Sequence, residues 1–173
     1  MTNWYVVTGG PSSGKTTTVN LLRERGYKTT IEHARHFIDT QRITGRTVAE
    51  IRANQMAFQK GVLDMQIEQE RIIDREELYF LDRALPDTLA YYRFLNLAPE
   101  PALVEALREV TYKKAFVLDL LPLVSDYART EDGEAQARIH ALIVEAYKSL
   151  EIAVELVPVL PAAARVDFIL ARL

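Results

Sequence analysis

The most constraining feature of the sequence is a glycine-rich segment close to the N-terminus. Residues 9–16 read Gly-Gly-Pro-Ser-Ser-Gly-Lys-Thr, which fits the phosphate-binding pattern G-x-x-x-x-G-K-[ST]. Residues 4–8, directly before it, are all aromatic or β-branched, as in a buried strand. Residues 16–25 have the apolar spacing of a helix, and Gly26 supplies a stop. Strand, loop and helix together predict a nucleoside triphosphate site of the Walker A type.

The residue types in this loop match the chemistry of phosphate binding. Glycine permits backbone conformations that point successive N–H groups into one anion-sized hollow, and the helix N-terminus adds partial positive charge. The Lys15 ammonium can reach the β- and γ-phosphates, and the Thr16 hydroxyl can ligate Mg²⁺. We therefore expect a nucleoside triphosphate and Mg²⁺ as ligands. The residues expected to bind the nucleotide are Gly9, Gly10, Pro11, Ser12, Ser13, Gly14, Lys15, Thr16 and Thr17.

Composition narrows the class of protein. A chain of 173 residues is expected to form one domain, residues 1–173. Its net charge of −3 predicts no nucleic-acid or membrane partner, and the absence of cysteine excludes disulfides and thiolate metal sites. No apolar run approaches the roughly 20 residues of a membrane span, and the first strand begins too early for a targeting peptide. We expect a soluble, cytoplasmic protein whose oligomeric state is left open.

Strands and helices alternate along the chain. Further strands are predicted at residues 27–31, 77–82, 115–119 and 156–160, with helices between them. This alternation favours an α/β fold with a mostly parallel sheet and helices on both faces. Because ligands of such sheets bind beyond the carboxyl ends of the strands, the glycine-rich loop, Glu32, Asp82 and Asp119 should converge there. Pro158 argues that the last predicted strand lies at an edge or at a break in pairing.

The longest predicted element is one helix from about Val48 to about Arg75. Thr47 and Glu50 form a capping-box pattern at its start. Gly61 inside it costs about 1 kcal/mol relative to alanine, which argues against a straight helix. A stripe with alternating spacings of four and three is expected to face the core. Its members are Ile51, Gln55, Phe58, Val62, Met65, Gln69 and Ile72.

A second informative segment is the short apolar strand that ends in Asp82 and is followed directly by Arg83. A carboxylate at a strand end beside a phosphate loop is typical of a Walker B element. Asp82 would either hold Mg²⁺ through water or accept a proton from an acceptor hydroxyl, and the sequence does not choose between these roles. The structural alternative is an N-cap for the helix that begins near Pro86. Arg83 would bind a substrate phosphate or Asp82 itself.

Arginines are the expected cations over the transferred phosphoryl group, because a guanidinium binds phosphate oxygens in pairs. Arg129 and Arg138 flank a polar segment with an Asp-Gly turn, and we predict them as covering cations, with a solvated surface loop as the alternative. The residues predicted to act in catalysis are thus Lys15, Asp82, Arg129 and Arg138. The residues predicted to bind the acceptor are Glu32, Arg35, Arg83 and Asp87, although each alone is more often a surface charge. The histidines His33, His36 and His140 have no metal-ligand spacing and are interpreted as structural or surface residues.

Several segments together resemble a known family, and they occur in matching order over nearly the whole chain. They are residues 8–17, 32–35, 58–59, 82–87 with 90–91, and 127–131. The combination of Asp-Arg-x-x-Pro-Asp with Tyr-x-Arg-Thr-Glu is more specific than the phosphate loop. The chain is similar to small P-loop AAA domains that include the kinase-like domain of the bacterial NAD regulators and an insect TRPL-translocation-defect GTP-binding protein. Ala84 stands where such domains often carry glycine.

This resemblance implies a three-layer, nucleoside- and nucleotide-kinase-like P-loop NTPase fold. The implied sheet has five parallel strands in the order 2-3-1-4-5, and an arginine-bearing lid at about residues 125–138 around Arg129. The resemblance also implies that Lys15, Thr16 and Asp82 handle ATP and Mg²⁺. In kinase relatives the acceptor enters between the second strand and the long helix, which would place Glu32 and Arg35 beside it. Members of the group include proteins with no known acceptor.

The leading hypothesis is a kinase that transfers the γ-phosphoryl of ATP to a small acceptor, a nucleoside or nucleotide. The alternative is an ATP- or GTP-binding regulatory switch with slow hydrolysis and a protein partner, although the chain lacks the N-K-x-D signature that reads guanine. A third hypothesis is phosphorylation of another metabolite, such as an antibiotic or a coenzyme precursor. The sequence leaves the acceptor and the choice between ATP and GTP open.

Overall fold

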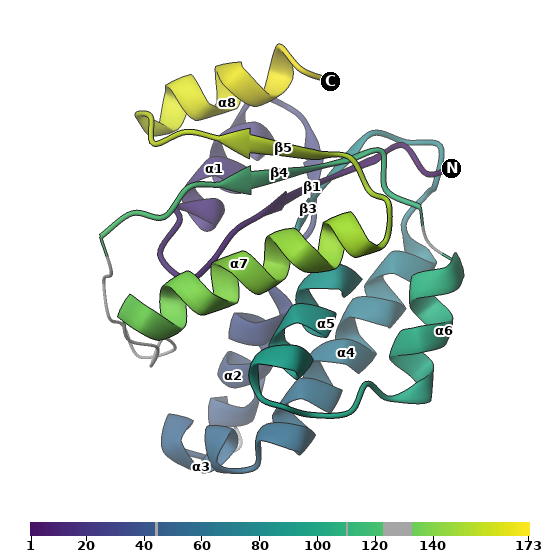
Figure 1. The fold of residues 1–173 in the computed structure, drawn as a ribbon, viewed down its shortest axis with the longest axis vertical. Helices are drawn as coiled ribbons and strands as arrows, with labels where there is room; N and C mark the ends of the chain where they lie inside the picture. Colours follow the sequence, from purple (N-terminus) through teal and green to yellow (C-terminus); the bar gives the residue numbers. More distant parts are fainter. Residues whose placement is uncertain (44, 110, 123–132) are drawn as a thin grey trace.

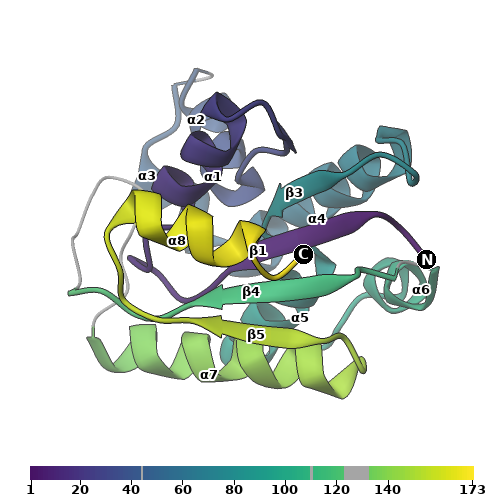
Figure 2. The same ribbon diagram turned by 90° about the horizontal axis from the view of Figure 1, so that it is seen from above.

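A parallel β-sheet forms the centre of the protein in this computed structural model (Figures 1 and 2). The structure describes residues 1–43, 45–109, 111–122 and 133–173. Within them, five strands run in the order β2-β3-β1-β4-β5, all parallel, which confirms the α/β fold class and the strand order implied by the resemblance. The strands are β1 (Trp4–Thr8), β2 (Lys28–Thr29), β3 (Tyr79–Asp82), β4 (Lys114–Leu118) and β5 (Val154–Val157).

β1 occupies the middle of the sheet because all five of its side chains tolerate burial. Its register places Val7 opposite Asp82 on β3 and Thr8 opposite Val117 on β4. The three central strands therefore end at one edge of the sheet. The glycine-rich loop that follows β1 emerges at this edge beside Asp82, as the alternating pattern of strands and helices predicted.

Helices cover both faces of the sheet and complete three layers (Figures 1 and 2). They are α1 (Lys15–Glu24), α2 (His33–Ile43), α3 (Val48–Ala53), α4 (Gln55–Ile72), α5 (Leu85–Phe94), α6 (Pro101–Glu109), α7 (Gly133–Ser149) and α8 (Ala162–Leu170). Side chains alternate along β1, so Trp4 and Val6 pack on the face covered by α4 to α7. Tyr5 and Val7 pack on the other face, against α1 and α8.

The two outer strands differ from their predicted lengths. β2 comprises two residues where five were predicted: only Lys28 and Thr29 pair with β3, and α2 begins at His33. β5 pairs with β4 and forms the opposite edge, and Pro158 lies one residue beyond its end. The missing N–H of Pro158 therefore interrupts no ladder bond, in agreement with the expected edge position.

The prediction of one long helix from Val48 to Arg75 is wrong, because the chain divides into α3 and α4 at Asn54. Asn54 has φ −100° and ψ 84°, and its side-chain oxygen accepts a hydrogen bond from the Ala57 N–H at 3.1 Å. It therefore acts as the N-cap of a new helix. The capping box at the start of α3 is confirmed: the Glu50 N–H donates to Thr47 Oγ1 at 3.2 Å, and the Thr47 N–H donates to Glu50 Oε2 at 2.8 Å.

α4 also turns a broader face inward than the predicted stripe. Gln55 and Ile72, which were predicted to face the core, are exposed. The buried residues of α4 are Phe58, Gln59, Val62, Leu63, Gln66 and Glu70. α4 packs against both α2 and α5, so its inward surface spans two neighbours rather than one. Three of these six side chains are polar, and one of them, Gln59, lines a pocket beside α4.

α2, α3 and α4 share a small apolar cluster beside the main core, formed by Ile38, Ile51, Phe58 and Val62. Phe37 of α2 packs edge-on against Phe58, with 5.6 Å between the ring centroids. Gly61 makes this approach possible, because a Cβ at this position would lie 2.6 Å from Cζ and 2.8 Å from Cδ2 of Phe37. Gly61 thus serves helix packing.

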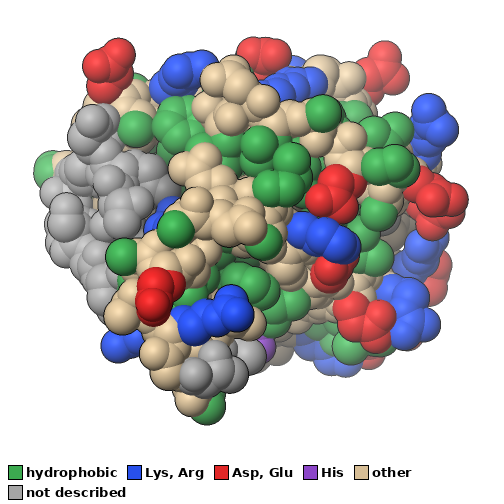
Figure 3. Space-filling view, turned by 90° about the horizontal axis from the view of Figure 1, so that it is seen from below, with side chains coloured by type: hydrophobic (Ala, Val, Ile, Leu, Met, Phe, Trp, Pro, Cys, Tyr) green, Lys and Arg blue, Asp and Glu red, His purple; other side chains and the backbone are tan. Residues whose placement is uncertain are grey.

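The surface on the side of α2 and α3 carries acidic and basic side chains interspersed with apolar ones (Figure 3). None of the helices in the described part of the chain is long and apolar enough to cross a membrane.

We predict that Gly61→Ala lowers the free energy of unfolding by about 1–3 kcal/mol. The methyl group overlaps the Phe37 ring and forces α2 and α4 apart, which outweighs the roughly 1 kcal/mol gained from helix propensity. Urea unfolding followed by circular dichroism measures this change.

Gly133→Ala is the matched control, because a Cβ at Gly133 meets no atom within 4 Å. It should leave the free energy of unfolding unchanged or slightly higher. Phe37→Leu should recover part of the loss in the Gly61→Ala background. Full stability of Gly61→Ala would contradict the proposed overlap.

Candidate functional site

The loop between β1 and α1 needs glycine at two positions for conformational reasons. Gly9 has φ +141° and Gly14 has φ +82°, in the region that disfavours side chains. A Cβ on Gly9 would lie 2.6 Å from the Leu118 carbonyl oxygen. Gly10 is different, because a Cβ there would lie 3.0 Å from the Cβ of His140 on α7. Gly9 is therefore needed for its backbone conformation, whereas Gly10 is needed for the close packing of the loop against α7.

Every carbonyl oxygen from residue 9 to residue 14 accepts a hydrogen bond. The donors in loop order are Lys15 Nζ for Gly9 and Gly10 (3.0 Å each), Gln136 Nε2 for Pro11 (2.8 Å), the Leu121 N–H for Ser12 (3.3 Å), Arg165 Nη1 for Ser13 (3.0 Å) and the Thr18 N–H for Gly14 (3.1 Å). These bonds fix the path of the loop backbone. A fixed loop at a helix N-terminus has the backbone arrangement that binds phosphate.

Three side chains from the C-terminal half of the chain take part in holding this loop. Gln136 and His140 come from α7, and Arg165 comes from α8. The Gly10 N–H donates to Nδ1 of His140 at 3.2 Å, which confirms the structural interpretation of this histidine. Arg165 is buried and also donates from Nε to the Leu160 carbonyl at 2.8 Å. Sequence reasoning missed Gln136 and Arg165, because no local pattern links them to a loop more than 120 residues away.

Lys15 is buried at the centre of the loop. Besides the two carbonyls, its ammonium group lies 3.4 Å from Ser13 Oγ. Burial, and then repulsion from Arg83, lower the pKa of Lys15 to about 8, while Glu32 and Asp82 act in the opposite direction. The ammonium is therefore still predominantly protonated at neutral pH and can bind a phosphate oxygen.

Asp82 lies at the end of β3, and its Oδ1 is buried without a hydrogen-bond partner among the described residues. Burial, and then repulsion from Glu32, raise the pKa of Asp82 to about 7, while Lys15 and Arg83 lower it. An unpartnered carboxylate oxygen and the exposed Thr16 on the first turn of α1 are oxygen donors of the kind that Mg²⁺ prefers. The residues present therefore fit a magnesium ion, which Asp82 and Thr16 would help to hold together with phosphate oxygens and water.

Asp87, rather than Asp82, caps helix α5. Its Oδ2 accepts a hydrogen bond from the N–H of Ala84, the N-cap residue, at 3.0 Å. Asp87 also accepts hydrogen bonds from the Thr8 and Tyr147 hydroxyls, and it is buried. Through these hydrogen bonds Asp87 links β1, α5 and α7. Asp87 also lines the pocket that lies beside α5.

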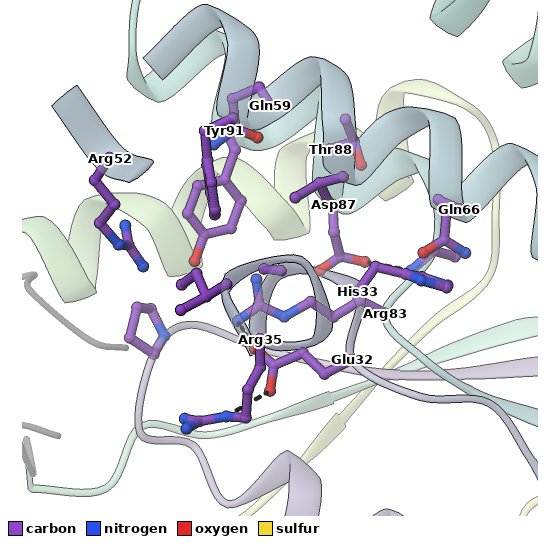
Figure 4. A pocket seen from close by; sticks show the side chains of 16 residues that line it. Glu32, His33, Arg35, Arg52, Gln59, Gln66, Arg83, Asp87, Thr88 and Tyr91 are labelled. Carbon is purple, nitrogen blue, oxygen red and sulfur yellow. Dashed lines mark hydrogen bonds and ion pairs between the residues drawn. The ribbon is translucent and has the colours of Figure 1, made fainter. Parts of the chain in front are cut away.

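A pocket opens between the glycine-rich loop, α2, α4 and α5 (Figure 4). The space between its walls, with the open mouth included, is about 690 Å³. Pro11 brings the phosphate loop to its wall. All four residues that were predicted to bind the acceptor line this pocket: Glu32, Arg35, Arg83 and Asp87.

Glu32 forms the centre of an ion cluster in this pocket. Its Oε1 lies 3.4 Å from Nη2 of Arg83, and its Oε2 lies 3.9 Å from Nε of Arg35. The side chains of Glu32 and Arg83 are only 13% and 14% exposed, so solvent screens this pair weakly. The guanidinium of Arg83 also lies over the Tyr91 ring, 5.3 Å from its centroid.

The backbone at Arg83 explains why alanine suffices at the next position. Arg83 itself takes the left-handed conformation, with φ +67°, and its N–H donates to the Val7 carbonyl at 3.1 Å. Ala84 is extended, with φ −149°, a conformation that any residue adopts. A non-glycine residue with positive φ is uncommon and concentrates at functional sites.

Gln66 belongs to a buried polar network behind the pocket. Its amide donates to Oε1 of Glu70, and the Tyr112 hydroxyl donates to Oε2 at 2.7 Å. The Leu85 N–H donates to the Tyr112 hydroxyl at 3.3 Å. Burial raises the pKa of Glu70 to about 7, although these hydrogen bonds act in the opposite direction. This network accounts for two of the polar side chains on the inward face of α4.

Of the two predicted covering cations, only Arg138 lies in the described part of the chain. Arg129 and most of the predicted lid, residues 125–132, lie outside the described residues. Arg138 is exposed on α7, and its guanidinium lies 5.5 Å from the centroid of the Phe94 ring. This contact directs Arg138 toward the end of α5, whereas Gln136 and His140 on the same helix contact the phosphate loop.

These features define a P-loop protein with a nucleoside- and nucleotide-kinase-like fold. Residues 4–165 match the AAA domain family, and the chain belongs to this family. None of the curated protein sequences matches the chain significantly.

Solved structures share the fold at low sequence identity. NadR protein in complex with NR matches with a TM-score of 0.67 and 19% identity, covering 89% of this chain and 43% of that one. Deoxyadenosine kinase from M. mycoides, with products dCMP and dCDP, matches with a TM-score of 0.63 and 14% identity, covering 98% of this chain and 97% of that one. Thymidylate kinase from Ehrlichia chaffeensis matches with a TM-score of 0.68 and 14% identity, covering 97% of this chain and 96% of that one. The chain thus spans less than half of the NadR chain.

We predict that Arg165→Gln weakens ATP binding about tenfold, as expected for losing a charged hydrogen bond to the loop backbone. The neutral side chain no longer holds the Ser13 carbonyl with a charged donor, so the loop loses its shape and part of its positive potential. Titration calorimetry with MgATP measures the dissociation constant.

Arg172→Gln is the matched control, because Arg172 follows the same helix but is exposed. It should bind ATP as the wild type does, and Arg165→Lys should be intermediate. An unchanged dissociation constant for folded Arg165→Gln would contradict the role of this arginine.

We also predict that Glu70 makes stability fall as pH rises. The pKa of Glu70 is about 7 in the folded protein and about 4.5 in the unfolded chain. Between pH 4.5 and pH 7 the folded state therefore holds a proton that the unfolded chain releases. The wild type should lose roughly 1–3 kcal/mol through this group between about pH 4.5 and pH 7. Urea unfolding of wild type and Glu70→Gln across this range measures the difference, and parallel pH profiles would refute it.

Proposed function

We propose that the protein is a kinase that transfers the γ-phosphoryl of ATP to a small acceptor, a nucleoside or nucleotide. The observation that carries this proposal is the pocket that adjoins the phosphate loop at Pro11 and contains the Glu32–Arg83 pair. A switch protein needs a phosphate loop, but it has no need of a charged small-molecule pocket against that loop. The kinase folds of the structural neighbours support this proposal.

On the nucleotide side, the loop backbone would bind the phosphates, and Lys15 would bind the β- and γ-phosphate oxygens. Thr16 and Asp82 would hold Mg²⁺, which neutralises charge on the phosphates when bound. Of the two roles that the sequence left open for Asp82, we favour this one. Asp82 lies in the field of Lys15, whereas Glu32 rather than Asp82 lines the acceptor pocket.

On the acceptor side, Glu32 would accept a hydrogen bond from an acceptor hydroxyl, and Arg83 would bind an acceptor oxygen. Arg35 supports both by its position beside Glu32. Asp87 would act through helix α5, because its oxygens already accept hydrogen bonds from the protein. Arg129 remains our proposed covering cation, and the Phe94 contact favours a supporting role for Arg138.

The test is release of ADP from MgATP with a panel of nucleosides, nucleoside monophosphates and nicotinamide riboside, beside a reaction without acceptor. We expect one acceptor class to stimulate ADP release strongly. Lys15→Ala and Asp82→Asn should each reduce the stimulated rate at least about a hundredfold, because each removes charge stabilisation from the transferred group.

Lys148→Ala and Glu105→Gln are matched charge controls, because both side chains are exposed away from the pocket. They should retain the wild-type rate. A slow rate that no acceptor raises would contradict the kinase proposal and favour the regulatory switch, with a protein partner to be sought.

A further inference from the structure

The side chains that line the acceptor pocket carry an excess of positive charge. Its lining includes three arginines, Arg35, Arg52 and Arg83, and two carboxylates, Glu32 and Asp87. Asp87 accepts hydrogen bonds from three protein donors, so Glu32 is the carboxylate that forms ion pairs with the arginines of the pocket. A partly buried site with this balance favours a ligand that brings negative charge.

The charge is also unevenly distributed within the pocket. In Figure 4, the guanidinium groups of Arg35 and Arg52 lie at one end, and His33 and Gln66 lie at the other. Arg52 reaches the pocket from α3, where its guanidinium lies 5.2 Å from the centroid of the Phe58 ring. This contact fixes the plane of a group that binds phosphate oxygens in pairs.

The opposite end offers neutral hydrogen-bonding groups. His33 is buried, and burial lowers its pKa although the neighbouring Gln69 side chain acts to raise it. Neither ring nitrogen makes a hydrogen bond of normal geometry within the described residues. A neutral imidazole presents one donor and one acceptor. Gln66 is held in place by Glu70. Arg83, between the two ends, has a buried Nε–H that makes no hydrogen bond to any described residue. These groups match the hydrogen-bonding edge of a planar heterocycle and a nearby oxygen.

We propose that the acceptor is a nucleoside 5′-monophosphate, with its phosphate between Arg35 and Arg52 and its base at the end formed by His33 and Gln66. This inference rests on the proposed kinase function and narrows its substrate class. An oxygen of the acceptor phosphate attacks the γ-phosphorus of ATP and forms the new P–O bond. The bond between that phosphorus and the β,γ-bridging oxygen breaks, and ADP leaves with the electron pair. The products are ADP and a nucleoside diphosphate, and no proton has to be removed from the acceptor.

The first experiment compares matched pairs, each nucleoside with its own 5′-monophosphate, by titration calorimetry and by ADP release from MgATP. We expect the monophosphate to be the better ligand and the better acceptor, with kcat/KM higher by at least about tenfold. Ribose 5-phosphate against ribose separates the contribution of the phosphate from that of the base.

The second experiment removes the charge of Arg52. Arg52→Gln should reduce the preference for the monophosphate about tenfold and leave binding of MgATP unchanged, whereas Arg52→Lys should retain part of the preference. Arg108→Gln, an exposed arginine on α6, is the matched control and should keep the wild-type preference.

The outcomes separate this inference from the function on which it rests. Equal or better use of the neutral nucleosides, with a normal rate of transfer, overturns the monophosphate assignment and leaves the kinase proposal standing. Binding of monophosphates without any stimulated ADP release overturns the kinase proposal, while the phosphate site itself stands. An unchanged monophosphate preference in folded Arg52→Gln overturns the role of Arg52.

Discussion

The hydrogen bonds that hold the carbonyl oxygens of the glycine-rich loop are the interaction on which the rest of the site depends. A loop of this sequence can take many shapes, because glycine restricts the backbone least. Gln136 of α7 and Arg165 of α8 select one shape by donating to the Pro11 and Ser13 carbonyls. The helices on both faces of the sheet thus contact the same short loop. The packing of these helices against the sheet therefore sets the backbone conformation of the loop, and with it the directions of the N–H groups that would bind an anion.

Electrostatic interactions connect this loop to the pocket lined by Glu32 and Arg83. Lys15 and Asp82 influence each other's pKa, and the charges of Glu32 and Arg83 influence the pKa of both. All four side chains are largely buried. Alternating charges of this kind stabilise one another only while each keeps its partners. The proposed phosphoryl transfer would bring further negative charge into this cluster, and the arginines that line the pocket would stabilise that charge. The left-handed backbone at Arg83 places its guanidinium between Glu32 and Tyr91.

Several parts of this arrangement could be read from local sequence. The Walker A pattern, the strand that ends in Asp82 and the alternation of strands and helices predicted the sheet edge on which the site lies. Glu32, Arg35 and Arg83 line the pocket, as their positions at the ends of β2 and β3 suggested. The break at Asn54 was missed, because apolar spacing continues through it and only the side-chain cap to Ala57 shows the new helix. Asp87, which was also predicted to bind the acceptor, lines the pocket too, and the structure adds that its oxygens accept hydrogen bonds from the Thr8 hydroxyl and the Ala84 N–H.

The sequence by itself determined the phosphate loop, the identity of its lysine and threonine, and the α/β alternation, because these depend on neighbours within a few residues. Tertiary structure alone decided which distant side chains complete the site. Arg165 reaches a carbonyl 152 residues away, Gly61 makes room for Phe37, and Arg52 enters the pocket over Phe58. No local pattern carries such contacts, since they arise only when the packed helices bring separate parts of the chain together.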